Sequence, residues 1–181
     1  MVGALKFYTV TWPQNGEGGV ASTNADWSLP SFSGEELLLS WTTPTFSMEG
    51  RFVDFQPNNG GVKLFSQRMR QTVDQHKAAN DRLEWLPLRI ARGRETQTYF
   101  ILHLLDELDV IDRKRSILIR TTGDVIKAHL RAELVGDHQI FTYSNKTGLI
   151  ILFTERIYEA MKSCSGCSFR AIPASGPEAR A

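Results

Sequence analysis

Four carboxylates lie within seven residues of one another in the segment LDELDVIDRKRS: Asp106, Glu107, Asp109 and Asp112. Carboxylates at this spacing could gather around a divalent cation, which prefers oxygen ligands. They could equally form an acidic surface that recognises a basic partner. The basic run Arg113–Arg115 follows directly and could instead neutralise them, which would leave an ordinary solvated turn.

The two cysteines form a CSGC motif, Cys164 and Cys167. A CxxC pair can be a redox couple or half of a zinc site. Redox pairs usually lie at a helix N-terminus, where the thiol pKa is lowered, whereas this pair follows the predicted end of a helix. A zinc site needs further ligands, and the histidines show no paired spacing: His76, His103, His129 and His138. A metal role and a redox role stay open, but an incidental turn is the favoured interpretation.

The sequence contains no motif of a known catalytic machinery. The GxSxG turn of α/β-hydrolases and the HExxH helix of zinc hydrolases are both missing. His103 lies in the apolar stretch TYFILHL and is interpreted as a packed core residue rather than a general base. We therefore expect no catalytic residues, no cofactor and no metal site.

The elements that must position these residues include a ten-residue sequence that occurs twice. LFSQRMRQTV (Leu64–Val73) and LFTERIYEAM (Leu152–Met161) lie 88 positions apart. In each copy an apolar run meets Ser66 or Thr154, residue types that cap helices, and apolar residues four apart then mark one helix face. Each copy closes with a short strand ending in proline, LEWLP and FRAIP. The pattern predicts two repeat-related strand–helix–strand units, with chance similarity as the alternative.

Other segments predict strands. Lys6–Trp12 alternates, Thr98–Leu104 is strongly β-prone, and the run from Val125 favours a strand although its residues also suit a helix. The predicted fold class is α+β, with a mostly antiparallel sheet and the two repeat helices packed on a sheet face. We expect a single domain over residues 1–181, with possible sub-structure at 1–97 and 98–174.

The apolar periodicity also predicts which side chains are buried. They are Phe65, Met69, Val73, Leu152, Phe153, Ile157 and Met161, together with Tyr99 or Phe100 and Ile101.

The composition of the chain indicates a soluble globular protein. The chain has 181 residues, of which 41% are apolar and 23% charged, as is ordinary for a soluble globular protein. Its net charge of +1 argues against a dedicated nucleic-acid binder. No apolar run reaches the roughly 18 residues of a membrane span, and the start MVGALKFYTVTW is interpreted as a strand rather than a signal peptide. We expect a cytoplasmic protein with neither nucleic-acid nor membrane partners.

The order of the motifs resembles a known family. Before the first capped helix the chain reads SFSGEEL and then VDFQ, and after that helix comes the strand LEWLPL. The later motifs follow in the order TYFILHLLDELDVIDRKRS, DHQIFTY, LFTERIYEAM and SFRAIP. Over roughly Ser31–Pro173 this order resembles the immunity-protein family eleven of bacterial polymorphic toxin systems, formerly a domain of unknown function. That family often has serine at both caps and arginine after the phenylalanine of the IF segment, whereas this chain has Thr154 and Thr142.

The resemblance implies a cytoplasmic, non-enzymatic protein that binds and neutralises a cognate toxin domain encoded next to it. A loop that follows a rigid strand commonly carries binding residues. The predicted partner-binding residues are therefore Asp106, Glu107, Asp109 and Asp112. The alternatives are an interaction or regulatory module unrelated to toxins, or a small enzyme with an unrecognised site.

Overall fold

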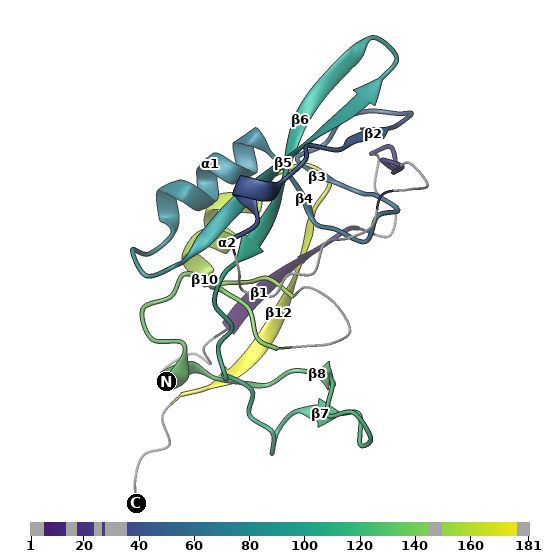
Figure 1. Ribbon diagram of the computed structural model, residues 1–181. Helices are drawn as coiled ribbons and strands as arrows, with labels where there is room; N and C mark the ends of the chain where they lie inside the picture. The colour runs from purple at the N-terminus through teal and green to yellow at the C-terminus, as the bar shows by residue number, and fades with distance from the viewer. Residues whose placement is uncertain (1–5, 14–17, 24–26, 28–35, 145–149, 177–181) are drawn as a thin grey trace, which may run out of the picture.

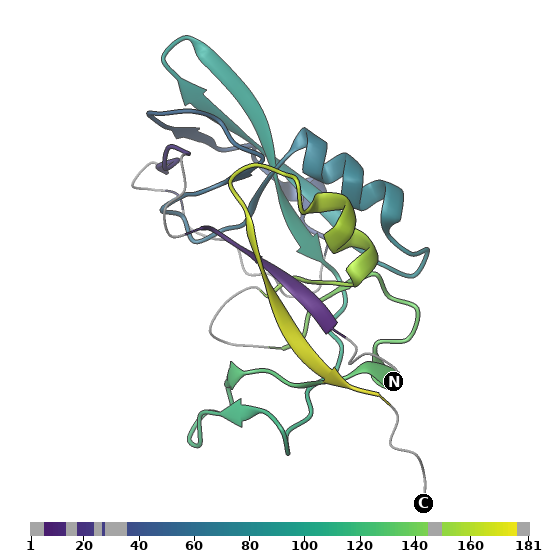
Figure 2. The same cartoon turned by 180° about the vertical axis from the view of Figure 1, so that it is seen from behind.

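The computed structural model describes residues 6–13, 18–23, 27, 36–144 and 150–176. Over these residues the chain is a sheet-rich α+β protein with mixed and antiparallel sheets, which confirms the predicted class. The described part contains two α-helices, α1 (Gln67–His76) and α2 (Glu155–Met161). They lie side by side and contact each other (Figures 1 and 2). Neither of these helices is long and apolar enough to cross a membrane.

Five of the described strands form sheet I, in the order β2–β5–β6–β4–β3. Their bounds are Thr45–Ser47 (β2), Phe55–Gln56 (β3), Leu64–Ser66 (β4), Leu83–Arg92 (β5) and Glu95–Leu104 (β6). β5 and β6 form a long antiparallel hairpin that projects from one end of the molecule (Figure 1). β2 pairs with β5 in parallel, so the sheet is mixed.

Five other described strands form sheet II, in the order β9–β12–β1–β11–β10. Their bounds are Lys6–Thr11 (β1), Leu130–Arg131 (β9), Ile140–Phe141 (β10), Leu152–Phe153 (β11) and Ser168–Ser175 (β12). The N-terminal strand β1 lies at the centre and is antiparallel to both of its neighbours. The edge strand β9 is parallel to β12.

A separate antiparallel pair, β7 (Ile117–Leu118) and β8 (Val125–Lys127), belongs to neither sheet. It lies beyond sheet II, at the opposite end of the molecule from the β5–β6 hairpin (Figure 1). Short 3-10 turns occur at Leu38–Ser40 (η1) and Ala132–Leu134 (η2). β8 and β9 confirm the strand prediction for the first part of the run from Val125, whereas its last residues form the turn η2.

Both helices begin where the sequence predicts, but their first residues are held differently. Ser66 Oγ accepts a hydrogen bond from Met69 N at 3.3 Å and so caps α1. Thr154 occupies the N-cap position of α2 without making a capping bond there. Its hydroxyl instead donates to Gln139 Oε1 at 2.6 Å. The side chain of Thr154 therefore stabilises the contact with β10 rather than the first turn of α2.

The predicted core residues are buried, Tyr99 and Phe100 both included. One apolar cluster joins the inner faces of both helices to Phe65, Trp85 and Phe100 of sheet I and to Val10 of β1. A second cluster lies on sheet II beneath the acidic run, and a third lies on sheet I around Phe46 and Tyr99. The helices thus bind the two sheets together through a shared core.

Two strands continue beyond the proline at which the sequence predicts their end. β5 passes through Pro87, and β12 passes through Pro173. β2 pairs only with Arg89–Ala91 of β5, so Pro87 has β6 as its strand partner on one side and no paired strand on the other. Proline is tolerated inside a strand where no ladder hydrogen bond from its backbone nitrogen is needed. The prediction that the two strands end at these prolines is wrong.

Candidate functional site

The acidic run leaves β6 and lies along the second apolar cluster. Leu108 N donates to Thr142 O at 2.9 Å, and Arg131 N donates to Val110 O at 2.8 Å. The side chains of Val110 and Ile111 are buried. Because these bonds and apolar contacts fix the backbone, the run presents its carboxylates from a defined surface.

Two of the predicted carboxylates are held by neighbouring donors. Asp106 Oδ1 lies 3.0 Å from Arg82 Nη1, in the loop before β5. Asp112 Oδ1 accepts hydrogen bonds from the backbone N–H groups of Lys114 at 3.0 Å and Arg115 at 3.2 Å. Arg115 Nε also lies 3.7 Å from Asp112. Asp106 and Asp112 therefore have a structural role that competes with partner binding.

The other two carboxylates are more available. The side chain of Asp109 is 83% exposed and lies 3.9 Å from Arg131, at the limit of an ion pair. Glu107 is exposed, and its backbone forms an isolated bridge with Thr142. Asp109 and Glu107 are thus the predicted residues that a partner could reach most directly.

Two cavities open beside the acidic run. The first has a volume of about 330 Å³ and an apolar wall with charged residues at its edge: Leu108, Ile111, Leu118, Val125, Glu107, Asp109 and Arg113. The second has a volume of about 500 Å³ and a mainly charged lining: Asp109, Asp112, Arg113, Lys114, Arg131 and Glu133. The structure therefore brings three predicted residues to these cavities, whereas Asp106 lines a separate small cavity with Arg82 and His138.

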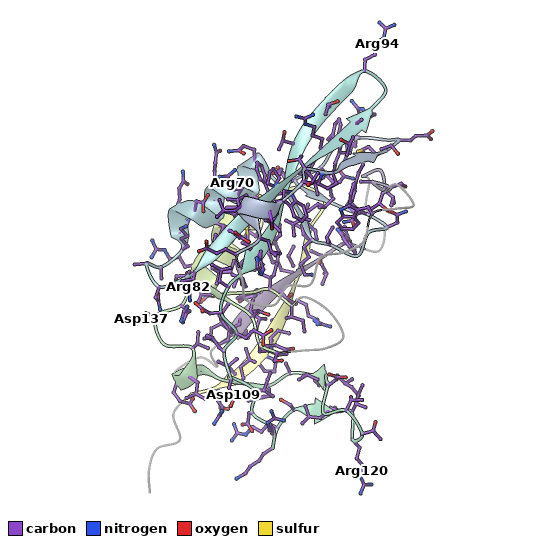
Figure 3. The ribbon with its side chains drawn as sticks, in the orientation of Figure 1. Arg70, Arg82, Arg94, Asp109, Arg120 and Asp137 are labelled. Atoms are coloured by element: carbon purple, nitrogen blue, oxygen red, sulfur yellow. The ribbon has the colours of Figure 1, made fainter. Side chains whose placement is uncertain are left out.

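The far walls of the cavities belong to the segment Arg113–Lys127, which we call the arm. Its strands pair Leu118 with Val125, and its turn contains Gly123, whose φ of +76° is strained for residues with a side chain. Asp109 lies where the arm joins the rest of the molecule, and Arg120 points away from it at the far end (Figure 3). The acidic run and the arm thus form one continuous surface around the two cavities.

The sequence indicated the acidic half of this surface and missed the basic half. Neutralisation of the carboxylates by the run Arg113–Arg115 was one alternative, but of these three residues only Arg115 pairs with a carboxylate of the acidic run in the described part of the chain. Asp106 and Asp109 are paired instead by Arg82 and Arg131, which belong to other elements. The alternation of apolar and polar residues within the arm predicted a strand, but it did not predict which of its side chains are exposed.

Comparison with known proteins places the chain in a family. The model of the immunity protein family (Imm11) matches residues 23–174, which is more than half of the chain. The chain belongs to this immunity protein family. A search of curated proteins gave no match.

In this member of the immunity protein family the CSGC cysteines lie in a loop after α2 that packs on the core. Cys164 is buried, Cys167 is partly buried, and both are free thiols. Burial raises the pKa of Cys167 to about 12, with a smaller effect from Cys164, and burial also raises the pKa of Cys164. A thiol with a raised pKa is a poor nucleophile. Within the described residues no group of three or more His, Cys, Asp and Glu side chains is arranged to hold a metal ion.

His103 is fully buried in β6, as predicted, and its Nδ1 lies 2.7 Å from Glu84 Oε1. The same carboxylate accepts hydrogen bonds from the backbone N–H groups of Leu37 and Leu38. Burial alone would raise the pKa of Glu84, but the hydrogen bonds from His103 and these two N–H groups hold it below its ordinary value. The pair thus fastens the segment around η1 to sheet I.

Proposed function

We propose that this chain is a cytoplasmic, non-catalytic immunity protein that binds and neutralises a cognate toxin of a polymorphic toxin system. The observation that carries this proposal is the family match over residues 23–174. Membership of an immunity family implies a protein toxin as the partner. Neutralisation by binding requires an accessible surface on a stable frame, and the acidic run with its two cavities supplies such a surface.

Co-expression tests the proposal. The toxic C-terminal domain encoded by the gene adjacent to this one is expressed in a bacterial host with and without the chain. We expect the chain to restore growth and to co-purify with that domain, and an unrelated toxin domain to remain toxic. Protection should saturate at one chain per toxin, because a binder is consumed stoichiometrically. Absence of both rescue and complex would refute the proposal, and complete protection at far lower ratios would refute the non-catalytic mechanism.

Within this function, the predicted binding residues are tested by removing their charge. The quadruple variant is Asp106→Asn, Glu107→Gln, Asp109→Asn and Asp112→Asn. Rim charges chiefly alter association rate and salt dependence, so slower association at low salt would show that the run faces a basic surface of the toxin, and faster association would show that it faces an acidic one. The single variant Asp106→Asn is the control, because that carboxylate faces Arg82. Unchanged rates in the quadruple variant would place the interface elsewhere.

We also infer that sheets I and II arose by duplication of one unit. In both sheets the strand before the helix and the strand after it flank a central antiparallel strand, β6 or β1. In both, the strand after the helix carries a parallel edge strand, and the strand before it carries an antiparallel one. A shared order of five strands with the same directions supports the repeat that the sequence suggests.

Individual contacts follow the same correspondence. Ser66 N and Thr154 N bond to the carbonyls of Asp54 and Gln139, and both hydroxyls donate to the side chains of those same residues. The 88-residue offset also relates two contacts between helix and central strand: Arg70 lies 4.5 Å over the ring of Phe100, and Tyr158 stacks on Tyr8 at 3.9 Å.

Exchange of residues between equivalent positions tests the duplication. We expect Arg70→Tyr to stack on Phe100 and to melt at or above the temperature of Arg70→Ala. If Arg70→Tyr is the less stable of the two, the positions are not equivalent.

A further inference from the structure

The charge of the chain is unevenly distributed, and the arm carries the excess. Between residues 113 and 127 there are five basic residues and one acidic residue, a net charge of +4, whereas the whole chain carries +1. The rest of the chain is therefore net negative, at −3. The basic residues of the arm are all exposed: Arg113, Lys114, Arg115, Arg120 and Lys127.

Most of these positive charges have no ion-pair partner in the part of the chain that the structure describes. Arg115 pairs with Asp112, but no carboxylate among the described residues pairs with the side chains of Arg113, Lys114, Arg120 and Lys127. The nearby carboxylates differ, since Asp106, Asp109 and Asp112 each have a basic partner within the chain. Of the acidic run only Glu107 lacks a basic partner among the described residues, whereas four cations of the arm lack an acidic one, so the unpaired charge of this surface is positive on balance.

The arm also exposes apolar side chains. Leu118 and Val125 face the first cavity, but Ile117 is 53% exposed and Ile126 is 64% exposed. Isolated exposed apolar residues are common, but here two isoleucines lie on neighbouring strands among unpaired cations. Protein interfaces combine an apolar centre with a charged rim, and this combination is what the arm presents.

The arm is joined to the rest of the fold at its two ends and by Val125, which packs against the second apolar cluster. β7 and β8 pair only with each other. Hydrogen bonds join the start of the arm to the segment before β9, among them His129 N to Ser116 Oγ at 2.9 Å and Ser116 Oγ to His129 O at 3.2 Å. A two-stranded hairpin is marginally stable on its own, and no described strand of either five-stranded sheet pairs with this one.

We propose that the arm is the docking element for the partner protein, and that the partner presents an acidic surface around an apolar depression. This inference rests on the proposed function, because it assigns the surface by which the chain would bind its toxin. Nucleic acid fits less well, because the arm has no aromatic side chain on which a base could stack. Ile117 and Ile126 would gain nothing from a phosphate backbone.

Two pairs of matched variants test the arm, with binding kinetics measured against the toxin domain of the adjacent gene. Arg120→Glu/Lys127→Glu reverses two arm charges, and Arg89→Glu/Arg94→Glu makes the same change in net charge on β5 and its turn. Figure 3 shows Arg94 and Arg120 at opposite ends of the molecule. We expect the arm variant to associate with the toxin domain at least about tenfold more slowly than wild type at low salt, and the difference to be smaller at high salt. The control variant should associate at the wild-type rate.

The second pair addresses the apolar residues. Ile117→Ser/Ile126→Ser should speed dissociation about tenfold or more, whereas Leu39→Ser, at a side chain 95% exposed on η1, should not. All substituted side chains are exposed, so melting temperatures should change little and loss of binding will not reflect unfolding.

The outcomes separate this inference from the proposed function. If wild type binds and both arm variants bind equally well, the arm is not the docking element although the function stands. If the controls weaken binding as much as the arm variants, the effect is one of total charge and the inference fails. Wild-type binding to duplex RNA or to anionic lipid vesicles, lost in the same arm variants, would also overturn the choice of a protein partner. If wild type does not bind the toxin domain, the proposed function and this inference both fall.

Discussion

Replacement of Lys63 by isoleucine should stabilise the protein at neutral pH. Lys63 directly precedes β4, and its Nζ donates to Val10 O of β1 in the other sheet at 3.2 Å. Burial, assisted by the positive charge of Arg170, lowers the pKa of Lys63 to about 8 from an ordinary 10.5. In the proposed duplication the equivalent residue is Ile151, which is fully buried. The second copy therefore already contains the residue that we would introduce into the first.

The magnitude follows from the lowered pKa. Each pH unit between the pKa values of the folded and unfolded states corresponds to about 1.4 kcal/mol, so a charged Lys63 destabilises the fold by about 3 kcal/mol. Loss of the hydrogen bond to Val10 O offsets about 1 kcal/mol of the gain. We expect Lys63→Ile to raise the free energy of unfolding at pH 7 by about 2 kcal/mol.

The pH dependence has a definite sign. The folded-state pKa of Lys63 lies below the unfolded-state value, so between pH 8 and 10.5 the unfolded chain binds a proton that the folded chain has released. Wild-type stability therefore gains a favourable contribution as pH rises through this range. The variant lacks this group, so its advantage should disappear by about pH 10.5, leaving only the lost hydrogen bond.

Urea unfolding of both proteins between pH 7 and 10.5 measures this difference directly. Other titrating groups are shared, so the variant-minus-wild-type difference isolates Lys63. Lys127→Ile is the matched control, because Lys127 is exposed on β8 and should show almost no effect at any pH. A difference for Lys63→Ile that is constant over the whole range would refute the reasoning.

Three further predictions concern the caps, the core and the thiols. Ser66→Ala should lower the free energy of unfolding by about 1–2 kcal/mol, because it removes both the capping bond and the bond to Asp54; Thr154→Ala should lower it by less, and equal losses in urea unfolding would contradict the two geometries. Phe153→Ala should cost about 3–5 kcal/mol by leaving a cavity in the shared core, and a variant that melts like wild type would disprove this placement. Cys167, with its pKa of about 12, should react with iodoacetamide at pH 8 about a thousandfold more slowly than free cysteine, and alkylation of the native protein at the rate of a free thiol would show an accessible thiolate.

Local patterns were enough to predict both helices and the residues of their buried faces. Apolar residues four positions apart after Ser66 and Thr154 indicate helices, because residues at that spacing lie on one face of a helix. Strand order was not predictable in this way. Several strands of the two sheets are two or three residues long, among them β2 at Thr45–Ser47, and such segments carry no periodic signal. Their places are set by pairing with distant strands, as when β1 inserts between β11 and β12.

The candidate surface was predicted only in part, for a similar reason. The sequence indicated that a charged loop follows β6, and the structure places it beside two cavities. Which charges remain unpaired depends on residues far away along the chain: Arg82 and Arg131 pair with two of the carboxylates. The sequence offered only the neighbouring run Arg113–Arg115 as a possible partner for them. The partners Arg82 and Arg131 can be identified only once the fold brings them together.

Because some charged side chains form ion pairs and others do not, the net charge of the chain does not describe the surface that a partner would meet. A net charge of +1 is a sum over the molecule, whereas steering of a partner depends on local charge within about 10 Å, since salt screens longer distances. Carboxylates that are already paired contribute less to that local field, and the unpaired cations of the arm, Arg120 and Lys127 among them, outnumber the unpaired Glu107 of the acidic run. An almost neutral immunity protein can therefore associate rapidly with an acidic partner, and the salt dependence of its association rate should follow the charges of the arm and not the total charge.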